Sequence, residues 1–80
     1  MQHDPIFERI ILICKEVFKQ DDLLVTESSD KNSISGWDSI SNLFFIDSVE
    51  KAFQVKFDLD DIMGIQNVGD MVSAVKKHQS

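Results

Sequence analysis

Apolar residues recur every three or four positions in several stretches, and this spacing is the feature that most constrains the fold. In the first stretch Ile6, Ile10 and Ile13 follow it, while charged residues fill the opposite side. Such spacing places apolar side chains on one face of an α-helix. Asp4-Pro5 just before it is typical of a helix start, since proline is tolerated in the first turn. The sequence therefore predicts an all-α fold, with helices over residues 5–19, 39–53, 59–64 and 67–77.

The predicted elements form a small four-helix bundle with a long first loop and a short third helix. The loop spans residues 21–37, and connections this long in a small domain usually cross the bundle or carry function. We expect Ile34 and Trp37 to fasten its far end to the core. Cys14 is the single cysteine, so no internal disulfide is possible, and we expect it to be buried and inert. We expect residues 1–80 to be one freestanding domain.

The charge balance restricts the classes of partner. The chain has fourteen acidic and eight basic residues, for a net charge of −6. Such a chain repels phosphate backbones, so no nucleic-acid binding is expected, whereas partners with basic patches suit it. No apolar run reaches membrane-spanning length, so no membrane insertion is expected. The lone cysteine suits a reducing cytosol, and we expect a cytoplasmic monomer. His3 and His78 form no ligand pattern, and no metal site is expected.

The predicted second helix carries apolar residues on two sides. About 100° of rotation per residue places Phe45, Ile46 and Val49 on one face, which we expect to face the core. Ile40 and Phe44 lie on roughly the opposite side, with Leu43 at its border. A bundle this small cannot easily cover both faces, so the outer one is expected to be an exposed patch that binds a partner. The alternative is that the 21–37 loop folds over Phe44 and buries it.

A serine stands at the predicted start of this helix, within Gly36-Trp37-Asp38-Ser39-Ile40. No histidine, lysine or cysteine lies near it in sequence to activate the hydroxyl, so no catalytic residue is predicted. The start of a helix concentrates partial positive charge and favours anions. Ser39 is therefore better interpreted as an attachment point than as a catalyst. The alternative is an ordinary helix-capping serine with no further role.

Asp38-Ser39-Ile40 resembles the Asp-Ser-Leu motif of acyl carrier proteins, and the resemblance continues through the helix spacing after Ser39. It implies that Ser39 receives a covalent 4'-phosphopantetheine arm from coenzyme A through a holo-carrier synthase, a phosphopantetheinyl transferase. The thiol of the arm would carry an acyl thioester to acyl-loading and acyl-transferring enzymes. The resemblance implies that Asp38, Ile40, Asp47, Glu50 and Asp58 bind partners, and the outer apolar face adds Leu43 and Phe44 to this set. Those implied to line an interior acyl pocket are Phe45, Ile46, Val49, Phe57, Ile62, Val68 and Met71.

Two positions depart from the pattern of fatty-acid carriers. Phe44 and Lys51 stand where those carriers usually have acids, which makes this helix more apolar and less acidic. The resemblance implies a role in fatty acid, polyketide or another specialised biosynthesis. The two departures argue against general fatty acid synthesis, and we expect a dedicated partner set such as that of a modular or gene-cluster pathway. The Gly-Gly-His that precedes Ser-Leu in many peptidyl carriers is absent, although an aminoacyl or peptidyl carrier stays open. The competing class is a helical protein-interaction module without a cofactor.

Overall fold

The sequence at each helix start supplies its own cap. The structure is a computed structural model that describes residues 4–79. Its helix α1 (Pro5–Val17) follows Asp4, whose Oδ1 accepts a hydrogen bond from the Ile6 N–H at 3.0 Å. The helix ends before the expected residue 19 because the backbone at Lys19 turns left-handed, with φ of 56°.

Helix α2 (Ser39–Phe53) is the longest, and it ends in the same way. Gln54 has a φ of 56°, and the Val55 N–H bonds back to the Glu50 carbonyl at 3.1 Å. Helix α3 (Leu59–Gly64) makes little more than one turn after Asp58, whose Oδ1 accepts from the Asp61 N–H at 2.8 Å. Local hydrogen bonds therefore fix the end of α2 and the start of α3, and the sequence indicates both in part.

Helix α4 (Val68–Gln79) runs past the expected residue 77. Its last turn contacts α3, where Lys77 Nζ and His78 Nε2 lie 3.0 and 2.6 Å from the Asp61 carboxylate oxygens. The His78 ring also packs against Phe57, with 5.6 Å between ring centroids. These contacts with a distant part of the chain hold the terminal turn in place.

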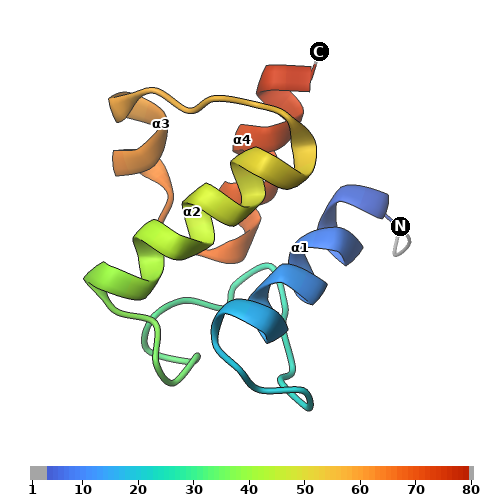
Figure 1. Ribbon diagram of the computed structural model, residues 1–80, viewed down its shortest axis with the longest axis vertical. Helices are drawn as coiled ribbons and strands as arrows, with labels where there is room; N and C mark the ends of the chain where they lie inside the picture. The colour runs from blue at the N-terminus through green and yellow to red at the C-terminus, as the bar shows by residue number, and fades with distance from the viewer. Residues whose placement is uncertain (1–3, 80) are drawn as a thin grey trace.

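The four helices enclose one apolar core, and no strand occurs within residues 4–79. Figure 1 shows α1, α2 and α4 around the centre, with the short α3 set to one side. The expected all-α bundle with a long first loop is therefore confirmed. Cys14 is fully buried, and this burial raises the pKa of its thiol to about 12, so the thiol stays protonated. No helix within the described residues is long and apolar enough to cross a membrane.

Three aromatic rings join the far end of the long loop to the core. Trp37 packs against Phe18 and Phe45 with ring centroids 5.6 and 5.4 Å away. Ile34 is also buried, at 1% exposure. As predicted, Ile34 and Trp37 fasten this end of the loop, and they set the position at which α2 begins.

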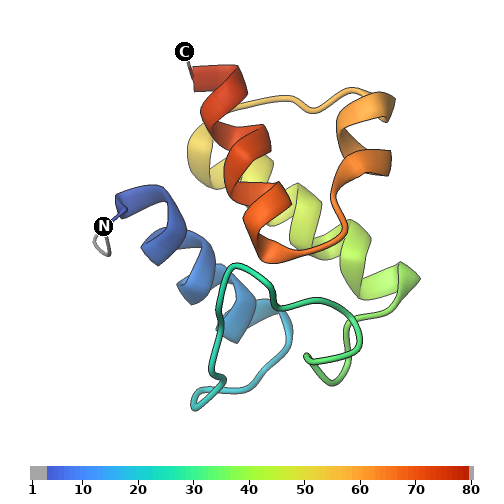
Figure 2. The ribbon, with the colours of Figure 1, turned by 180° about the vertical axis from the view of Figure 1, so that it is seen from behind.

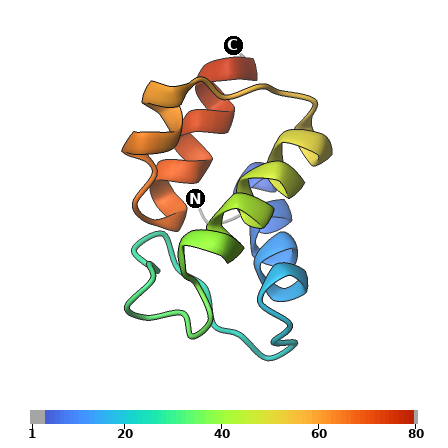
Figure 3. The same cartoon turned by 60° about the vertical axis from the view of Figure 1, so that its left-hand side comes forward.

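The middle of the long loop packs against the start of α4. The N–H groups of Val68 and Gly69 donate to the carbonyls of Ser29 and Glu27 at 2.9 and 2.7 Å. Figure 2 shows, from behind, the loop crossing this end of the bundle, and Figure 3 shows it below the starts of both α2 and α4. The loop therefore closes one end of the bundle and leaves the outer side of α2 uncovered.

Candidate functional site

Ser39 is the first residue of α2, and its side chain is exposed to solvent. Gly36 turns the chain toward this point with a φ of +90°, a left-handed conformation that glycine adopts without strain. Trp37 then enters the core, and Asp38 caps the helix. Ser39 is thus held on the rigid end of a helix next to a buried anchor.

Asp38 organises the first turn of α2 through a reciprocal set of hydrogen bonds. Its Oδ1 accepts from the N–H groups of Ile40 and Ser41 at 3.0 and 2.9 Å, and its own N–H donates to Ser41 Oγ at 2.8 Å. The backbone hydrogen bond from Ser41 is the main cause that lowers the pKa of Asp38 below its ordinary value. This carboxylate stays ionised at neutral pH and fixes the turn on which Ser39 stands.

The two serines of this turn differ in their hydrogen bonds. Ser41 Oγ donates to the Gly36 carbonyl at 2.7 Å, so its hydroxyl belongs to the cap. The Ser39 hydroxyl has no protein partner among the residues that the structure describes. Among the described residues, no histidine or cysteine lines the space beside it, so no Ser–His or Cys–His type of arrangement is present there. The arrangement fits a modification by another enzyme.

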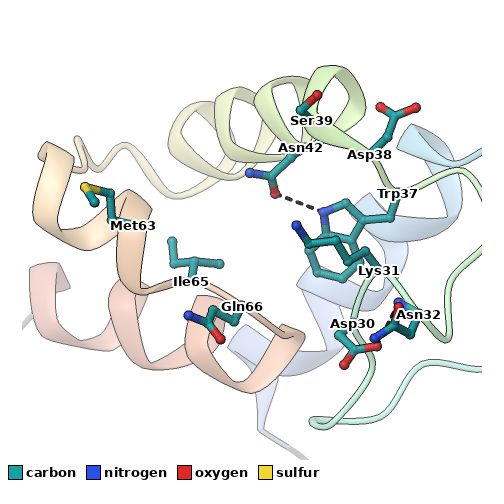
Figure 4. A pocket seen from close by; sticks show the side chains of 10 residues that line it. All are labelled: Asp30, Lys31, Asn32, Trp37, Asp38, Ser39, Asn42, Met63, Ile65 and Gln66. Atoms are coloured by element: carbon teal, nitrogen blue, oxygen red, sulfur yellow. Dashed lines mark hydrogen bonds between the residues drawn. The ribbon is translucent and has the colours of Figure 1, made fainter.

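A cleft of about 540 Å³ opens beside Ser39, between the long loop, the start of α2 and the connection from α3 to α4. On one of its sides, the Trp37 indole N–H donates to Asn42 Oδ1 at 2.9 Å. Figure 4 shows this bond on one wall of the cleft and Met63, Ile65 and Gln66 on another. The lining residues are Asp30, Lys31, Asn32, Trp37, Asp38, Ser39, Asn42, Met63, Ile65 and Gln66.

Sequence reasoning missed most of this lining. Asn42 gave one signal, since it is a polar residue on the core face of a helix, where a buried partner is needed. The Trp37 indole is that partner. Lys31 and Gln66 gave no such signal, because loop and connection residues meet only in the folded chain.

The outer face of α2 is exposed over its first two turns. Ile40, Leu43 and Phe44 are 67%, 64% and 63% exposed. The alternative that the long loop buries Phe44 is therefore wrong, because that loop packs against α4 instead. Asp47 continues the face and forms an exposed ion pair with Lys51 at 3.0 Å. We call Ile40, Leu43 and Phe44 the outer patch.

The three acids expected to meet partners have different surroundings. Asp47 is exposed on the outer face of α2. Glu50 is half-buried, and its Oε2 accepts from the Phe57 N–H at 2.7 Å, which ties the α2–α3 connection to α2. Asp58 is exposed and caps α3. Within residues 4–79, the Asp47 side chain thus accepts no hydrogen bond from the backbone, whereas the Glu50 and Asp58 side chains each accept one.

The residues expected to line an interior acyl pocket form the core. Ile62 is half-buried, and the other six are buried, with Phe45, Val49, Val68 and Met71 at 0% exposure. None of the seven lines the cleft beside Ser39. The interior positions and the cleft are therefore separate places. Within residues 4–79 no cluster of three metal-ligating side chains occurs, and His3 lies outside the described residues.

Comparisons with known proteins agree with this geometry. Residues 8–75 match the family described as "Phosphopantetheine attachment site". The chain is 32% identical to the acyl carrier protein of Lactobacillus acidophilus, over 99% of each chain. It is also similar to the solution structure of a holo acyl carrier protein from Geobacter metallireducens, with a TM-score of 0.87, 32% identity, and coverage of 95% of this chain and 87% of that one. The chain therefore belongs to the acyl carrier protein family, as a non-catalytic carrier with covalently attached 4'-phosphopantetheine as its cofactor.

Proposed function

We propose that Ser39 carries the 4'-phosphopantetheine arm and that the chain presents an acyl group on it to partner enzymes. The observation that supports this most is the exposed Ser39 hydroxyl, which has no partner among the described residues and stands on a fixed helical turn. The site fits a phosphodiester, because the helix dipole favours an anion there and Lys31 lines the adjoining cleft. The thiol of the bound arm supplies the thioester chemistry.

Intact mass tests the attachment residue. The protein is incubated with coenzyme A and a promiscuous phosphopantetheinyl transferase. Wild type is expected to gain the mass of one phosphopantetheine, and Ser39→Ala to gain none. Ser35→Ala is the matched control, since Ser35 is an exposed serine in the loop just before the site, and it is expected to be modified like wild type. An unmodified wild type would instead favour a cofactor-free interaction module.

The outer patch, with Asp38 and Asp47 beside it, is the proposed surface for partner enzymes. It combines exposed apolar groups with few acids, so it suits partners whose docking surfaces are less basic and more apolar than those that bind strongly acidic carriers. Glu50 and Asp58 add negative charge at the far end of α2 but also stabilise the fold. We propose that the partners belong to a specialised biosynthetic pathway in the cytoplasm, with a monomeric carrier.

Acyl exchange with a housekeeping fatty acid synthase tests this surface. The wild-type holo-protein is expected to exchange poorly, and Phe44→Glu, which supplies the acid typical of fatty-acid carriers, is expected to exchange faster. Leu12→Glu is the control, since Leu12 is 62% exposed on α1, away from the outer patch. Efficient exchange by wild type would contradict a dedicated partner set.

A further inference from the structure

We propose that the cleft beside Ser39 holds the inner part of the arm and favours a short acyl group with hydrogen-bonding substituents. In this arrangement Lys31 pairs with the phosphodiester on Ser39. The proposal rests on Ser39 being the attachment residue. It concerns the position of the arm on this carrier and the class of cargo, which the family as such does not specify.

The position and size of the cleft are the first argument that it holds the arm. Ser39 is part of its lining, so a group attached to Ser39 Oγ starts at its edge. Its volume of about 540 Å³ lies within the ~300–1,000 Å³ usual for small-molecule sites. Both main walls are fixed, since Trp37 is 6% exposed and Ile65 is 8% exposed. The arm can therefore lie in the cleft without a change in the backbone.

The charges of the lining residues are the second argument, and they concern the phosphodiester. Lys31 is the one basic residue that lines the cleft, and no carboxylate of the described residues lies within 4.0 Å of its Nζ. The two acids of the lining already accept backbone hydrogen bonds. Asp38 caps α2, and Asp30 Oδ1 accepts from the N–H groups of Asn32 and Ser33 at 2.9 and 3.2 Å. A phosphodiester on Ser39 adds negative charge beside these acids. Lys31 is the basic side chain of the lining that can form an ion pair with it.

The hydrogen-bonding groups of the lining are the third argument, and they concern the class of acyl group. Asn42 uses its Oδ1 for Trp37, which leaves its amide donors for a ligand, and Gln66 offers a second amide on the opposite wall (Figure 4). The arm has two amide groups that can pair with such side chains. The apolar lining is confined to Trp37, Met63 and Ile65, and the interior positions such as Val49 and Met71 are fully buried. A long alkyl chain would have to displace core contacts, whereas a short polar group would not.

Three loaded forms of the holo-protein test the preferred cargo: 3-hydroxybutyryl, butyryl and octanoyl. The first two differ in a single hydroxyl. Trp37 is the only tryptophan, so its indole N–H gives one NMR resonance at the cleft, and methyl resonances of Val49 and Met71 report on the interior. The indole resonance is expected to shift on arm attachment and to shift further with 3-hydroxybutyryl than with butyryl. A smaller shift with 3-hydroxybutyryl than with butyryl, or large interior methyl shifts with it, would overturn the proposal.

Lys31→Met tests the pairing with the phosphodiester. In the holo-form, most of the indole shift that follows arm attachment is expected to be lost. Lys56→Met, an exposed lysine outside the cleft lining, is the matched control and is expected to keep it. Equal shifts in both variants would overturn the role of Lys31. Intact mass separates the two proposals, because a wild type that is modified but shows no indole shift refutes the cleft alone, while an unmodified wild type refutes the attachment itself.

Discussion

Ser39 and Ser41 stand on the same helical turn, yet only one of their hydroxyls takes part in the fold. Ser41 Oγ lies 2.7 Å from the Gly36 carbonyl and 2.8 Å from the Asp38 N–H, so it closes the cap. The Ser39 hydroxyl is not used by the cap, because Asp38 and Ser41 already satisfy the capping hydrogen bonds. The cap uses the hydroxyl of Ser41, and this choice leaves the hydroxyl of Ser39 exposed to solvent.

The titration of Asp61 is linked to the contact between α3 and α4. Its side chain is 5% exposed and lies between Lys77 and His78 of α4. The hydrogen bond with His78, followed by that from Lys77, holds the pKa of Asp61 far below its ordinary value. The carboxylate is therefore charged in the folded protein at every physiological pH.

The free energy of unfolding is expected to fall in acid because of this group. The pKa of Asp61 is lower in the folded state than in the unfolded chain, where it is about 3.9. Its stabilisation is therefore fully present above that pH and is lost as the pH falls toward the folded-state pKa. Asp61→Asn is expected to be less stable than wild type at neutral pH and to lose less stability between about pH 4 and pH 2.

Urea unfolding at a series of pH values measures this effect. Asp60→Asn is the control, because Asp60 is an exposed acid on the same short helix. Its acid dependence is expected to match that of wild type. The same acid dependence in Asp61→Asn and wild type would show that the ion pair with α4 does not form in solution.

Helix α2 combines two functions by placing them on opposite faces. Phe44 and Phe45 are neighbours in sequence, but the first is 63% exposed and the second is fully buried. The core face positions the helix, and the outer face remains available for partners. One element thus serves both as scaffold and as proposed docking surface.

Alanine substitution of these two residues tests the rotation of the helix. Phe45→Ala is expected to lower the free energy of unfolding by about 3–5 kcal/mol, since it leaves a cavity against Phe18 and Trp37. Phe44→Ala is expected to change it by less than about 0.5 kcal/mol. Chemical denaturation of both variants measures the difference, and similar losses would mean that the outer patch is buried in solution.

The molecule as a whole depends on α4 to hold the long loop. Gly69 makes this contact possible: a Cβ at this position would lie 3.0 Å from the Glu27 carbonyl oxygen and 3.3 Å from Asn67 Oδ1. The loop carries Trp37 at its far end and contributes Asp30, Lys31 and Asn32 to the cleft lining. The start of α4 therefore helps to position the site, although it lies far from Ser39 in sequence.

Gly69→Ala is expected to push the loop away from α4. The expected cost is about 1 kcal/mol, the lower end of what overpacking costs, since alanine also gains helix propensity. The protection of the position-69 amide, taken relative to its intrinsic exchange rate, is expected to be lower than in wild type, because the hydrogen bond to the Glu27 carbonyl lengthens. Gly64→Ala is the control, since a Cβ there meets nothing within 4 Å. Unchanged protection in Gly69→Ala would contradict the close contact.

The positions of the helices could be predicted from the sequence, because a cap and an apolar stripe are local features. Asp4-Pro5 and Asp38-Ser39 mark helix starts within a few residues, and helical spacing alone separates the two faces of α2. The ends of α1 and α4 were less predictable. The first depends on the left-handed turn at Lys19, and the second on ion pairs with Asp61 in another helix.

The sequence by itself therefore determined the helical class, the place of Ser39 and the family to which the chain belongs. Only the tertiary structure decided that the long loop lies against α4 rather than over Phe44, and that Lys31, Asn42 and Gln66 share a cleft with Ser39. The physical reason is the distance along the chain between the residues that interact. Helix caps and apolar faces arise from residues within a few positions of one another, whereas a cleft forms from segments brought together by burial of the common core.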